Sequence, residues 1–325
     1  MNVIFVTGSD AAFFNSMLVG LQSFAERMPG QRLLVCDFGF SGAQAAFLRG
    51  LGVLLERPPT LASAGVFHCK AALLAYLRHN GHDIGPDDIV VWLDADLTLM
   101  DVGVGDFAAV LAAMASAGVA IAVCPEPLGR SFGQMLSGPN ASTMAPSARI
   151  AAQAGMDFAS PYVSSGLFFC RSAAFLTRWQ ELTQGNAYHP LFEQNMFNVA
   201  LHEKRAAFVA LDCEEWQAQG PSLDKIALVP TAKGGRLAAA IGDKNIKTLH
   251  ATSGVPGHLL IGNCRMTVRD MDLVGPFKLF LAEALRLHQL QLLARFLADH
   301  GKALRRLGVC SRAARPADGF EFVTL

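Results

Sequence analysis

The feature that most constrains the fold is a fully apolar segment at residues 89–93 (Ile-Val-Val-Trp-Leu), which runs directly into Asp94 and Asp96. A short run of β-branched and aromatic residues after a Pro-Asp-Asp turn at 86–88 predicts a strand buried on both faces. Such strands belong to parallel sheets covered by helices. Two carboxylates at the end of a buried strand cost stability unless a cation balances them. We therefore expect a parallel sheet with a functional site at one edge.

Strand and helix patterns alternate through the first half of the chain, which predicts an α/β fold with a mostly parallel central sheet flanked by helices. Ligands of such sheets bind beyond the carboxyl ends of the strands. The predicted strands are 3–6, 31–36, 53–55, 89–93, 119–124, 163–169 and 248–250. The predicted helices are 13–28, 44–51, 68–78, 107–116, 172–183 and most of 276–307.

Two stretches need separate interpretation. Residues 107–124 carry no charge, but Ala is abundant and a Ser-Ala-Gly sequence ends at Gly118, so we expect a helix followed by a buried strand rather than a membrane span. Residues 125–160 are rich in Gly, Pro, Ser and Met and are expected to form a long loop.

Composition excludes some classes of protein. The 27 basic and 27 acidic residues of this 325-residue chain balance, so a nucleic acid partner is not expected. Seven dispersed Cys without a CxxC pair predict neither a zinc knuckle nor a disulfide framework, and favour a reducing compartment. The N-terminus has no basic segment before its first apolar run, which predicts a strand rather than a signal peptide. We expect a cytoplasmic protein.

Asp94 and Asp96 lie two positions apart, and in an extended chain residues i and i+2 face the same side. Both carboxylates can then serve one hard divalent cation, which commonly shares its oxygen ligands with substrate phosphates. The competing interpretation is that the two Asp residues only turn the chain and cap the next element.

The sequence Asp94-Ala95-Asp96 after this strand resembles the DxD motif of GT-A-fold, nucleotide-sugar-dependent glycosyltransferases. Four further features occur in the same order as in that family. They are the strand and turn from Val3 to Asp10, the Ser164-Ser165-Gly166 strand, Glu193-Gln194, and His250 followed by Gly254. The last is similar to the late His of the family-eight-like branch, although Gly254 comes one position late and no Lys-Pro-Trp follows. Retaining or inverting stereochemistry therefore stays open.

The resemblance covers roughly residues 1–260 and implies a domain organisation and a reaction. It implies a catalytic domain at 1–265, with a nucleotide-binding half (1–100) and an acceptor half (101–265), and a helical C-terminal extension at 266–325. It implies transfer of a hexose from a nucleoside diphosphate, with UDP as the favoured nucleotide, to an acceptor hydroxyl. The implied cofactor is Mn²⁺ or Mg²⁺, and the implied acceptor is a glycan, a lipid-linked molecule or a protein.

The resemblance also distributes roles among residues. Asp94, Asp96 and His250 would hold the metal, and Glu193 and Gln194 would act on the acceptor side as catalytic groups. Donor contacts would come from the residues after the first strand, the DxD turn and the small-residue strand. These are Thr7, Gly8, Asp10, Lys70, Asp94, Ala95, Asp96, Ser165, Gly166 and Gly254.

Each of these residues also has a structural interpretation. Lys70 begins a helix, where a cation and free N–H groups suit a phosphate, but it is equally a solvated first-turn Lys. Thr7 and Asp10 are suited to nucleotide hydrogen bonds or to ordinary turn and N-cap chemistry. Glu193 is otherwise a surface helix residue, and His250 a hydrogen-bonded structural one.

Two other functions stay open. Asp94-Ala-Asp96-Leu-Thr98 matches the DxDxT pattern of haloacid-dehalogenase-type phosphatases, in which Asp94 would be the nucleophile. A nucleotide-sugar-binding protein without turnover is the third class. The Gly129-to-Gly133 sequence formally fits a hydrolase nucleophile elbow, but Pro residues on its approach exclude the required strand.

The C-terminal segment 271–315 contains eight basic and three acidic residues, with apolar residues at near-helical spacing. Such a basic amphipathic segment is suited to an anionic membrane surface, where it would make peripheral contact near a lipid-linked acceptor. The alternative, which we favour, is a pair of helices packed on the catalytic domain or on another subunit, so that an oligomer is compatible with the sequence.

Overall fold

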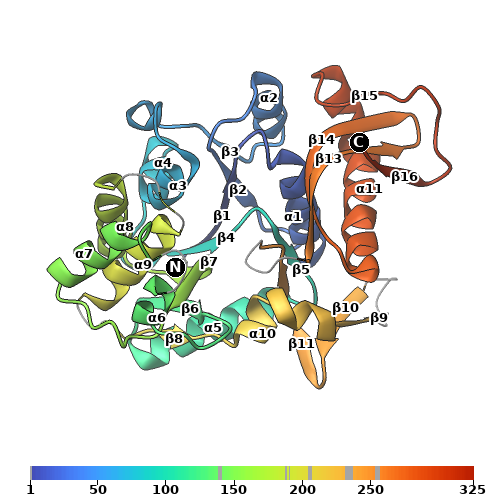
Figure 1. Ribbon diagram of the computed structural model, residues 1–325. Coiled ribbons are helices and arrows are strands. Elements are labelled where there is room, and N and C mark those ends of the chain that lie inside the picture. Colours follow the sequence, from blue (N-terminus) through green and yellow to red (C-terminus); the bar gives the residue numbers. More distant parts are fainter. Residues whose placement is uncertain are drawn as a thin grey trace. The chain divides into compact units, whose positions relative to one another are not determined.

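The computed structural model describes residues 2–137, 141–186, 189, 191–203, 207–230, 237–252 and 257–325 (Figure 1). It confirms the α/β class, with a mostly parallel central sheet flanked by helices. Seven strands form this sheet in the order β3-β2-β1-β4-β7-β6-β8. Strand β1 (Val3–Ser9) pairs in parallel with β4 (Ile89–Leu93), while β7 (Val163–Cys170) is antiparallel to both of its neighbours, β4 and β6 (Ile121–Pro125).

The chain divides into two compact units. The first comprises Met1–Val6, Leu55–Leu93 and Gly105–Cys213, and the second comprises Thr7–Leu54, Asp94–Val104 and Glu214–Leu325. Because the chain passes from one unit to the other within β1 and again after β4, the apolar strand 89–93 belongs to the first unit and the Asp residues that come after it to the second.

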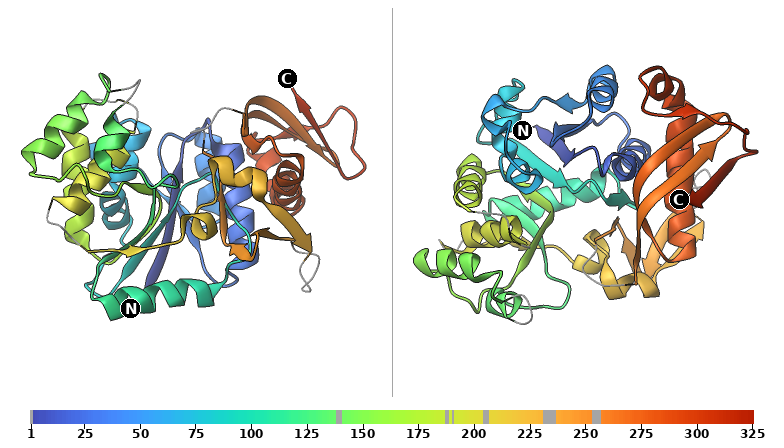
Figure 2. Two further views of the ribbon diagram at one scale, coloured as in Figure 1. Left: turned by 60° about the horizontal axis from the view of Figure 1, so that its bottom comes forward. Right: turned by 45° about the horizontal axis from the view of Figure 1, so that its top comes forward.

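The first unit is built around β4, β7 and β6, with the short β8 (Val209–Ala210) pairing in parallel with β6. Its helices are η1 (Pro59–Leu61), α3 (Val66–Ala71), α4 (Leu73–His79), α5 (Val104–Ala117), α6 (Phe132–Leu136), α7 (Ala145–Gln153), α8 (Ala173–Gln184) and α9 (Phe192–His202). Helices α8 and α9 pack on each other, and α9 packs on β7 (Figure 2). The rings of Phe168, Trp179 and Phe197 meet there in a fully buried cluster.

Two expectations about the first unit have different outcomes. The uncharged stretch 107–124 folds as predicted, into α5 and the buried strand β6. The expected long loop at 125–160 instead contains α6 and α7. Ser131 begins α6 with a capping box, in which its hydroxyl accepts from the N–H of Gln134 while the Gln134 side chain accepts from the N–H of Ser131. Such short helices depend on caps rather than on periodicity, which explains why apolar spacing did not predict them.

The second unit contains α1 (Phe14–Arg27), α2 (Gly42–Gly50) and α11 (Glu283–Arg306), together with β2 (Leu33–Asp37) and β3 (Leu54–Leu55). The described residues also form three small sheets, β12-β5, β11-β10-β9 and β15-β14-β13-β16. Their strands are β5 (Leu97–Leu99), β9 (Ala227–Pro230), β10 (Leu237–Ile241), β11 (Lys244–Ile246), β12 (Thr248–His250), β13 (Leu259–Val268), β14 (Met271–Phe280), β15 (Ser311–Arg312) and β16 (Phe320–Thr324). Two short helices, α10 (Cys213–Trp216) and η2 (Gly220–Lys225), precede β9 along the chain.

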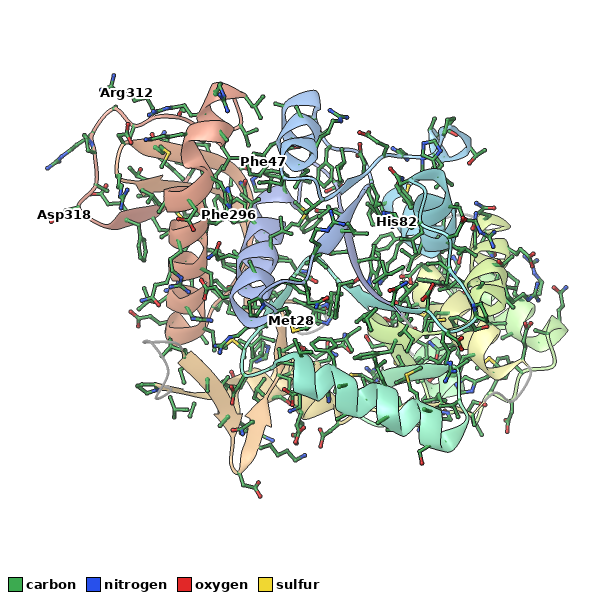
Figure 3. All side chains as sticks on the ribbon, turned by 180° about the vertical axis from the view of Figure 1, so that it is seen from behind. Met28, Phe47, His82, Phe296, Arg312 and Asp318 are labelled. Carbon is green, nitrogen blue, oxygen red and sulfur yellow. The ribbon has the colours of Figure 1, made fainter. Side chains whose placement is uncertain are left out.

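The core of the second unit lies among α1, α2, α11 and β14, which contact one another. Phe47 on α2 and Phe296 on α11 approach to a centroid distance of 6.0 Å in an edge-to-face arrangement (Figure 3). Both side chains are almost completely buried. Burial of each such aromatic ring contributes about 2 kcal/mol, so this contact ties α11 firmly to the unit.

The C-terminal extension departs in part from the expected helical pair. A helix is present, α11, but residues 276–280 belong to strand β14, which pairs along its whole length with β13. The apolar residues Leu292, Phe296 and Leu297, which suggested a membrane-facing side, are buried in the core. Within the described ranges, no helix combines the length and apolar character needed to cross a membrane.

Candidate functional site

The DxD sequence forms a tight turn. Strand β4 is buried along its whole length, and the N–H of Leu97 donates to the carbonyl of Asp94 at 3.0 Å, which closes a four-residue turn. The expected extended arrangement of the two Asp residues is therefore wrong, because the chain bends between them. Gly20 of α1 packs so closely on this turn that a Cβ there would lie 3.1 Å from the Leu97 carbonyl oxygen and 3.4 Å from that of Ala95.

His250 reaches the turn through strand pairing. After the turn the chain enters β5, whose antiparallel partner is β12, with Leu97 opposite His250. The N–H of Ala251 donates to the carbonyl of Asp96 at 3.1 Å and so continues the ladder. This pairing joins residues about 150 positions apart in the sequence, and all of them belong to the second unit.

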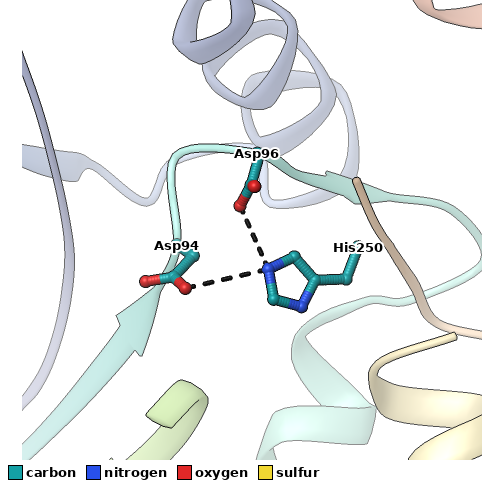
Figure 4. A group of neighbouring side chains, drawn as sticks. All are labelled: Asp94, Asp96 and His250. Atoms are coloured by element: carbon teal, nitrogen blue, oxygen red, sulfur yellow. Dashed lines mark ion pairs between the residues drawn. The ribbon is translucent and has the colours of Figure 1, made fainter. Parts of the chain in front are cut away.

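The three side chains converge on one point, as Figure 4 shows. The His250 Nε2 atom lies 3.1 Å from Asp96 Oδ1 and 3.7 Å from Asp94 Oδ2. One ligand atom from each residue lies within 4.8 Å of the others, which makes this a group able to hold a metal ion. Asp94 keeps 24% of its side chain exposed, whereas His250 keeps 7%, so the cluster is accessible from the Asp94 side.

Lys278 is a fourth member of the cluster. It lies on β14, and its Nζ atom forms an ion pair with Asp96 Oδ2. Burial raises the pKa of Asp96, but the charges of His250 and Lys278 and their hydrogen bonds outweigh this effect and hold the pKa well below its ordinary value. Asp96 is therefore a carboxylate at any physiological pH.

Gln217 holds the other side of the imidazole. Its side-chain amide lies 2.8 Å from His250 Nδ1, and it is fully buried. The segment that carries Gln217 is fixed beside β12, since the N–H of His250 donates to the carbonyl of Ala218 at 2.9 Å. A partner on Nδ1 orients the ring and leaves Nε2 directed at the two carboxylates.

The end of the first strand and the turn after it also lie in the second unit. Thr7 is buried, and its hydroxyl has no hydrogen-bond partner within the described part of the chain. Gly8 is required by packing, because a Cβ there would lie 2.3 Å from the ring of Phe38. Asp10 Oδ1 accepts from the N–H groups of Ala12 and Phe13, each at 3.0 Å, so this carboxylate fixes the turn that leads into α1.

In the first unit, the structure brings together four of the predicted site residues. Lys70 Nζ lies 3.1 Å from Ser165 Oγ and 3.6 Å from Glu193 Oε2, and Gln194 Oε1 accepts from the Ser165 N–H at 3.2 Å. Lys70 and Glu193 keep only 8% and 6% of their side chains exposed. The Lys70 ammonium also lies 5.7 Å from the ring centre of Trp92. Lys70 is therefore not a solvated surface residue, and Glu193 is not on the helix surface.

A network of buried amides on α9 surrounds this group. The Tyr162 hydroxyl donates to Asn195 Oδ1 at 2.7 Å and is 3.2 Å from Gln194 Nε2. Asn198 bonds both backbone groups of Val163, at 2.8 and 2.9 Å, and so fastens α9 to β7. Burial raises the pKa of Tyr162 far above its ordinary value, so it is a neutral hydroxyl.

Two predicted donor-binding residues complete the comparison with the sequence. Gly166 is buried within β7, and Gly254 lies outside the described residues. Sequence reasoning missed Lys278 and Gln217. In the sequence, Lys278 was noted only as part of a basic segment. The alternation of apolar Phe277, charged Lys278 and apolar Leu279 is a local pattern typical of a strand. No local signal pointed to Gln217.

Known proteins were compared with the chain by sequence and by structure. No family model and no curated protein matches the chain. Among solved structures, similarity is found to the bifunctional glycosyltransferase WbbM, with 11% identity, a TM-score of 0.45, and coverage of 66% of this chain and 39% of that one. The chain thus spans about two fifths of the length of WbbM.

Two structures of LgtC are also similar. One is an active-site mutant (15% identity, TM-score 0.43), and the other is described as the galactosyltransferase in complex with donor and acceptor sugar analogues (13% identity, TM-score 0.42). Each match covers 77% of this chain and 86% of LgtC. WbbM and LgtC are both glycosyltransferases, the class that the sequence resembles. Since the TM-scores are below 0.5, we infer function from the geometry of the site.

Proposed function

We propose that this chain is a metal-dependent glycosyltransferase that uses a nucleoside-diphosphate sugar, with a UDP-hexose as the favoured donor. One observation carries the proposal: Asp94, Asp96 and His250 direct three ligand atoms to a single point at the carboxyl end of β4. Ligand sites of open α/β sheets lie at this position. The order of motifs along the sequence supplies the family resemblance.

The donor set fits a hard or borderline divalent ion. Two carboxylate oxygens suit Mg²⁺ or Mn²⁺, and the imidazole nitrogen shifts the preference toward Mn²⁺. His250 is held by Gln217 on Nδ1, and its Nε2 faces both carboxylates. The partial exposure of Asp94 leaves a side through which phosphate oxygens can approach the ion.

The bound ion would supply Lewis-acid stabilisation of the negative charge that develops on the departing diphosphate. Residues of the chain would hold the ion, orient the acceptor and contact the donor. Asp94, Asp96 and His250 hold the ion, and Gly20 keeps α1 close to the turn that carries both Asp residues. Glu193, beside Lys70, and Gln194, within the α9 network, are proposed to orient the acceptor hydroxyl. Lys70, Ser165 and Gly166 are proposed donor contacts, as are Thr7, Gly8, Asp10, Ala95 and Gly254.

A thermal-shift panel tests the proposal. The full chain is melted with UDP, GDP, ADP and their common hexose conjugates, each with Mn²⁺, with Mg²⁺ and with EDTA. A true donor raises the melting temperature only with metal, and the rise grows with ligand concentration over Kd. The Asp94→Ala and Asp96→Ala variants are expected to lose this metal-dependent stabilisation while they still fold.

The panel also separates the other two functions. Mg²⁺-dependent release of phosphate from simple phosphoesters would favour the phosphatase, with Asp94 as the nucleophile. UDP binding without donor hydrolysis or sugar transfer would favour a binding protein. Unchanged metal-dependent stabilisation in both Asp variants would contradict the metal site.

The proposed partners are a nucleotide-sugar donor and a glycan, lipid-linked or protein acceptor. The 1–265 and 266–325 domain division and the cytoplasmic location stay predictions.

A further inference from the structure

Lys278 is held in place against Asp96 by its strand. On either side of it along β14, Phe277 and Leu279 are buried, and the Lys278 N–H donates to the Ser16 hydroxyl at 2.9 Å. Its side chain is only 11% exposed, and its Nζ atom lies 5.7 Å from the ring centre of Phe13. The ammonium is therefore a fixed part of the cluster rather than a mobile surface charge.

The charge balance of the cluster depends on this ammonium. Its ion pair with Asp96 Oδ2 offsets the charge of that carboxylate. A divalent cation held by Asp96 would bring two positive charges next to the Lys278 ammonium, and like charges repel. An ion that carries a polyphosphate brings compensating negative charge, and this charge is attracted to the same ammonium.

We propose that Lys278 makes this site selective for a divalent cation that arrives together with a polyphosphate, and that it disfavours the bare ion. The inference depends on the proposed metal site and adds a specificity-determining residue to it. In the absence of ligand, Lys278 neutralises Asp96. When a cation and its polyphosphate bind, the ammonium would exchange the carboxylate oxygen for a phosphate oxygen. The Asp96 carboxylate would then bind the cation instead of Lys278.

A purely structural ion pair makes a different prediction. If Lys278 served only to stabilise the fold around Asp96, its removal would displace the metal ligands Asp94, Asp96 and His250 whatever the ion carries. Binding of the bare ion and of the ion–polyphosphate complex would then weaken together or stay unchanged. The proposed role requires the two affinities to change in opposite directions.

The test compares two probes on the full-length chain. Binding of Mn²⁺ alone is followed by the loss of the free-ion electron paramagnetic resonance signal, and binding of preformed Mn²⁺–pyrophosphate is followed by calorimetry. For Lys278→Met, which removes the charge but keeps the length, we expect Mn²⁺ alone to bind about tenfold more tightly. We expect Mn²⁺–pyrophosphate to bind about tenfold more weakly, a change of about 1.4 kcal/mol in each case.

Matched variants complete the experiment. Lys278→Arg keeps the charge and is expected to resemble the wild type, and Lys302→Met removes an exposed lysine of α11 and should change neither affinity. Thermal melts check folding, and Lys278→Gln replaces Lys278→Met if the latter does not fold.

Affinities that change in the same direction, or not at all, would overturn the role of Lys278 while leaving the metal site intact. Absence of Mn²⁺ binding by every variant, with and without pyrophosphate, would overturn the metal site itself and this inference with it.

Discussion

Two groups of charged side chains have little exposure but differ in composition: Lys70 with Glu193 in the first unit, and Asp94, Asp96 and Lys278 in the second. Lys70 and Glu193 pair one cation with one anion, and the amides of α9 lie next to them. In the second unit two carboxylates share one ammonium and one imidazole. The first arrangement offers one carboxylate next to an ammonium, whereas the second gathers three side chains whose ligand atoms can hold a metal ion. Burial of charge alone therefore does not identify a metal site, and the set of converging ligand atoms is the better guide.

The largest expected effect sharpens this comparison in the first unit. Lys70→Met leaves the buried Glu193 carboxylate without its cation, which should cost about 3–5 kcal/mol of the free energy of unfolding. Denaturant unfolding of the variant measures the loss. The double variant Lys70→Met, Glu193→Gln removes both charges and should recover a large part of it. A loss below about 1 kcal/mol would mean that the two residues do not form a buried structural pair.

A second prediction compares the buried histidines of the two units. Burial, with the charges of Arg295 and Arg27, lowers the pKa of His288 to about 4. Its Nε2 has no hydrogen-bond partner among the described residues. Burial also lowers the pKa of His202, but the Pro161 carbonyl opposes this shift. Both folded pKa values are depressed, so both histidines favour the fold in the neutral state.

The contribution of His288 is therefore complete above the unfolded pKa of about 6.5 and is lost as the pH falls toward 4, by about 3 kcal/mol. His288→Leu should remove this part of the acid sensitivity, as measured by urea unfolding at pH 7, 6, 5 and 4. His202→Leu should remove less. Equal acid sensitivity in the wild type and His288→Leu would show that His288 is not the group responsible.

A third prediction concerns the support of His250. Gln217→Leu removes the side-chain partner of His250 Nδ1 and should weaken Mn²⁺ affinity about 10- to 100-fold, because partners of metal ligands typically have effects of this size. Mn²⁺ titration gives the affinity. Asn195→Leu disrupts a buried amide of the first unit and is the matched control. It should cost stability and leave Mn²⁺ affinity unchanged, and a similar loss of affinity in both variants would contradict the comparison.

The smallest expected effect uses two tightly packed glycines, one in each unit. A Cβ at Gly20 would lie 3.1 Å from the Leu97 carbonyl oxygen, and a Cβ at Gly133 would lie 3.1 Å from that of Phe158. Both Ala variants should therefore lose about 1 kcal/mol through overpacking. Only Gly20→Ala displaces the DxD turn, so only it should weaken Mn²⁺ binding, by a few-fold. If both or neither changed Mn²⁺ affinity, packing on the turn would not control the site.

Much of the fold could be predicted from local sequence. The buried strand β4, the helix and strand that replace a membrane span at 107–124, and β7 each result from apolar runs and turn residues within about 20 positions. The prediction failed where a short cap or a long-range pairing decides the structure. Helix α6 depends on the capping box between Ser131 and Gln134, and residues 276–280 become a strand because β13 lies alongside them. The apolar spacing in Pro276–Phe280 is compatible with a helix as well as with a strand.

For the site, the position of Asp94 and Asp96 after a buried strand was evident from adjacent residues, because a strand end and its charges are local. The side chains that lie next to these carboxylates were not evident from the local sequence. Strand pairing between β5 and β12 brings His250 to the turn, and the packing of β14 on α1 brings Lys278 to Asp96. Such contacts join segments more than 150 positions apart, and their free energy comes from ladders and cores that no short window of sequence contains. The local sequence thus identified the two carboxylates, and long-range packing placed the imidazole and the ammonium beside them.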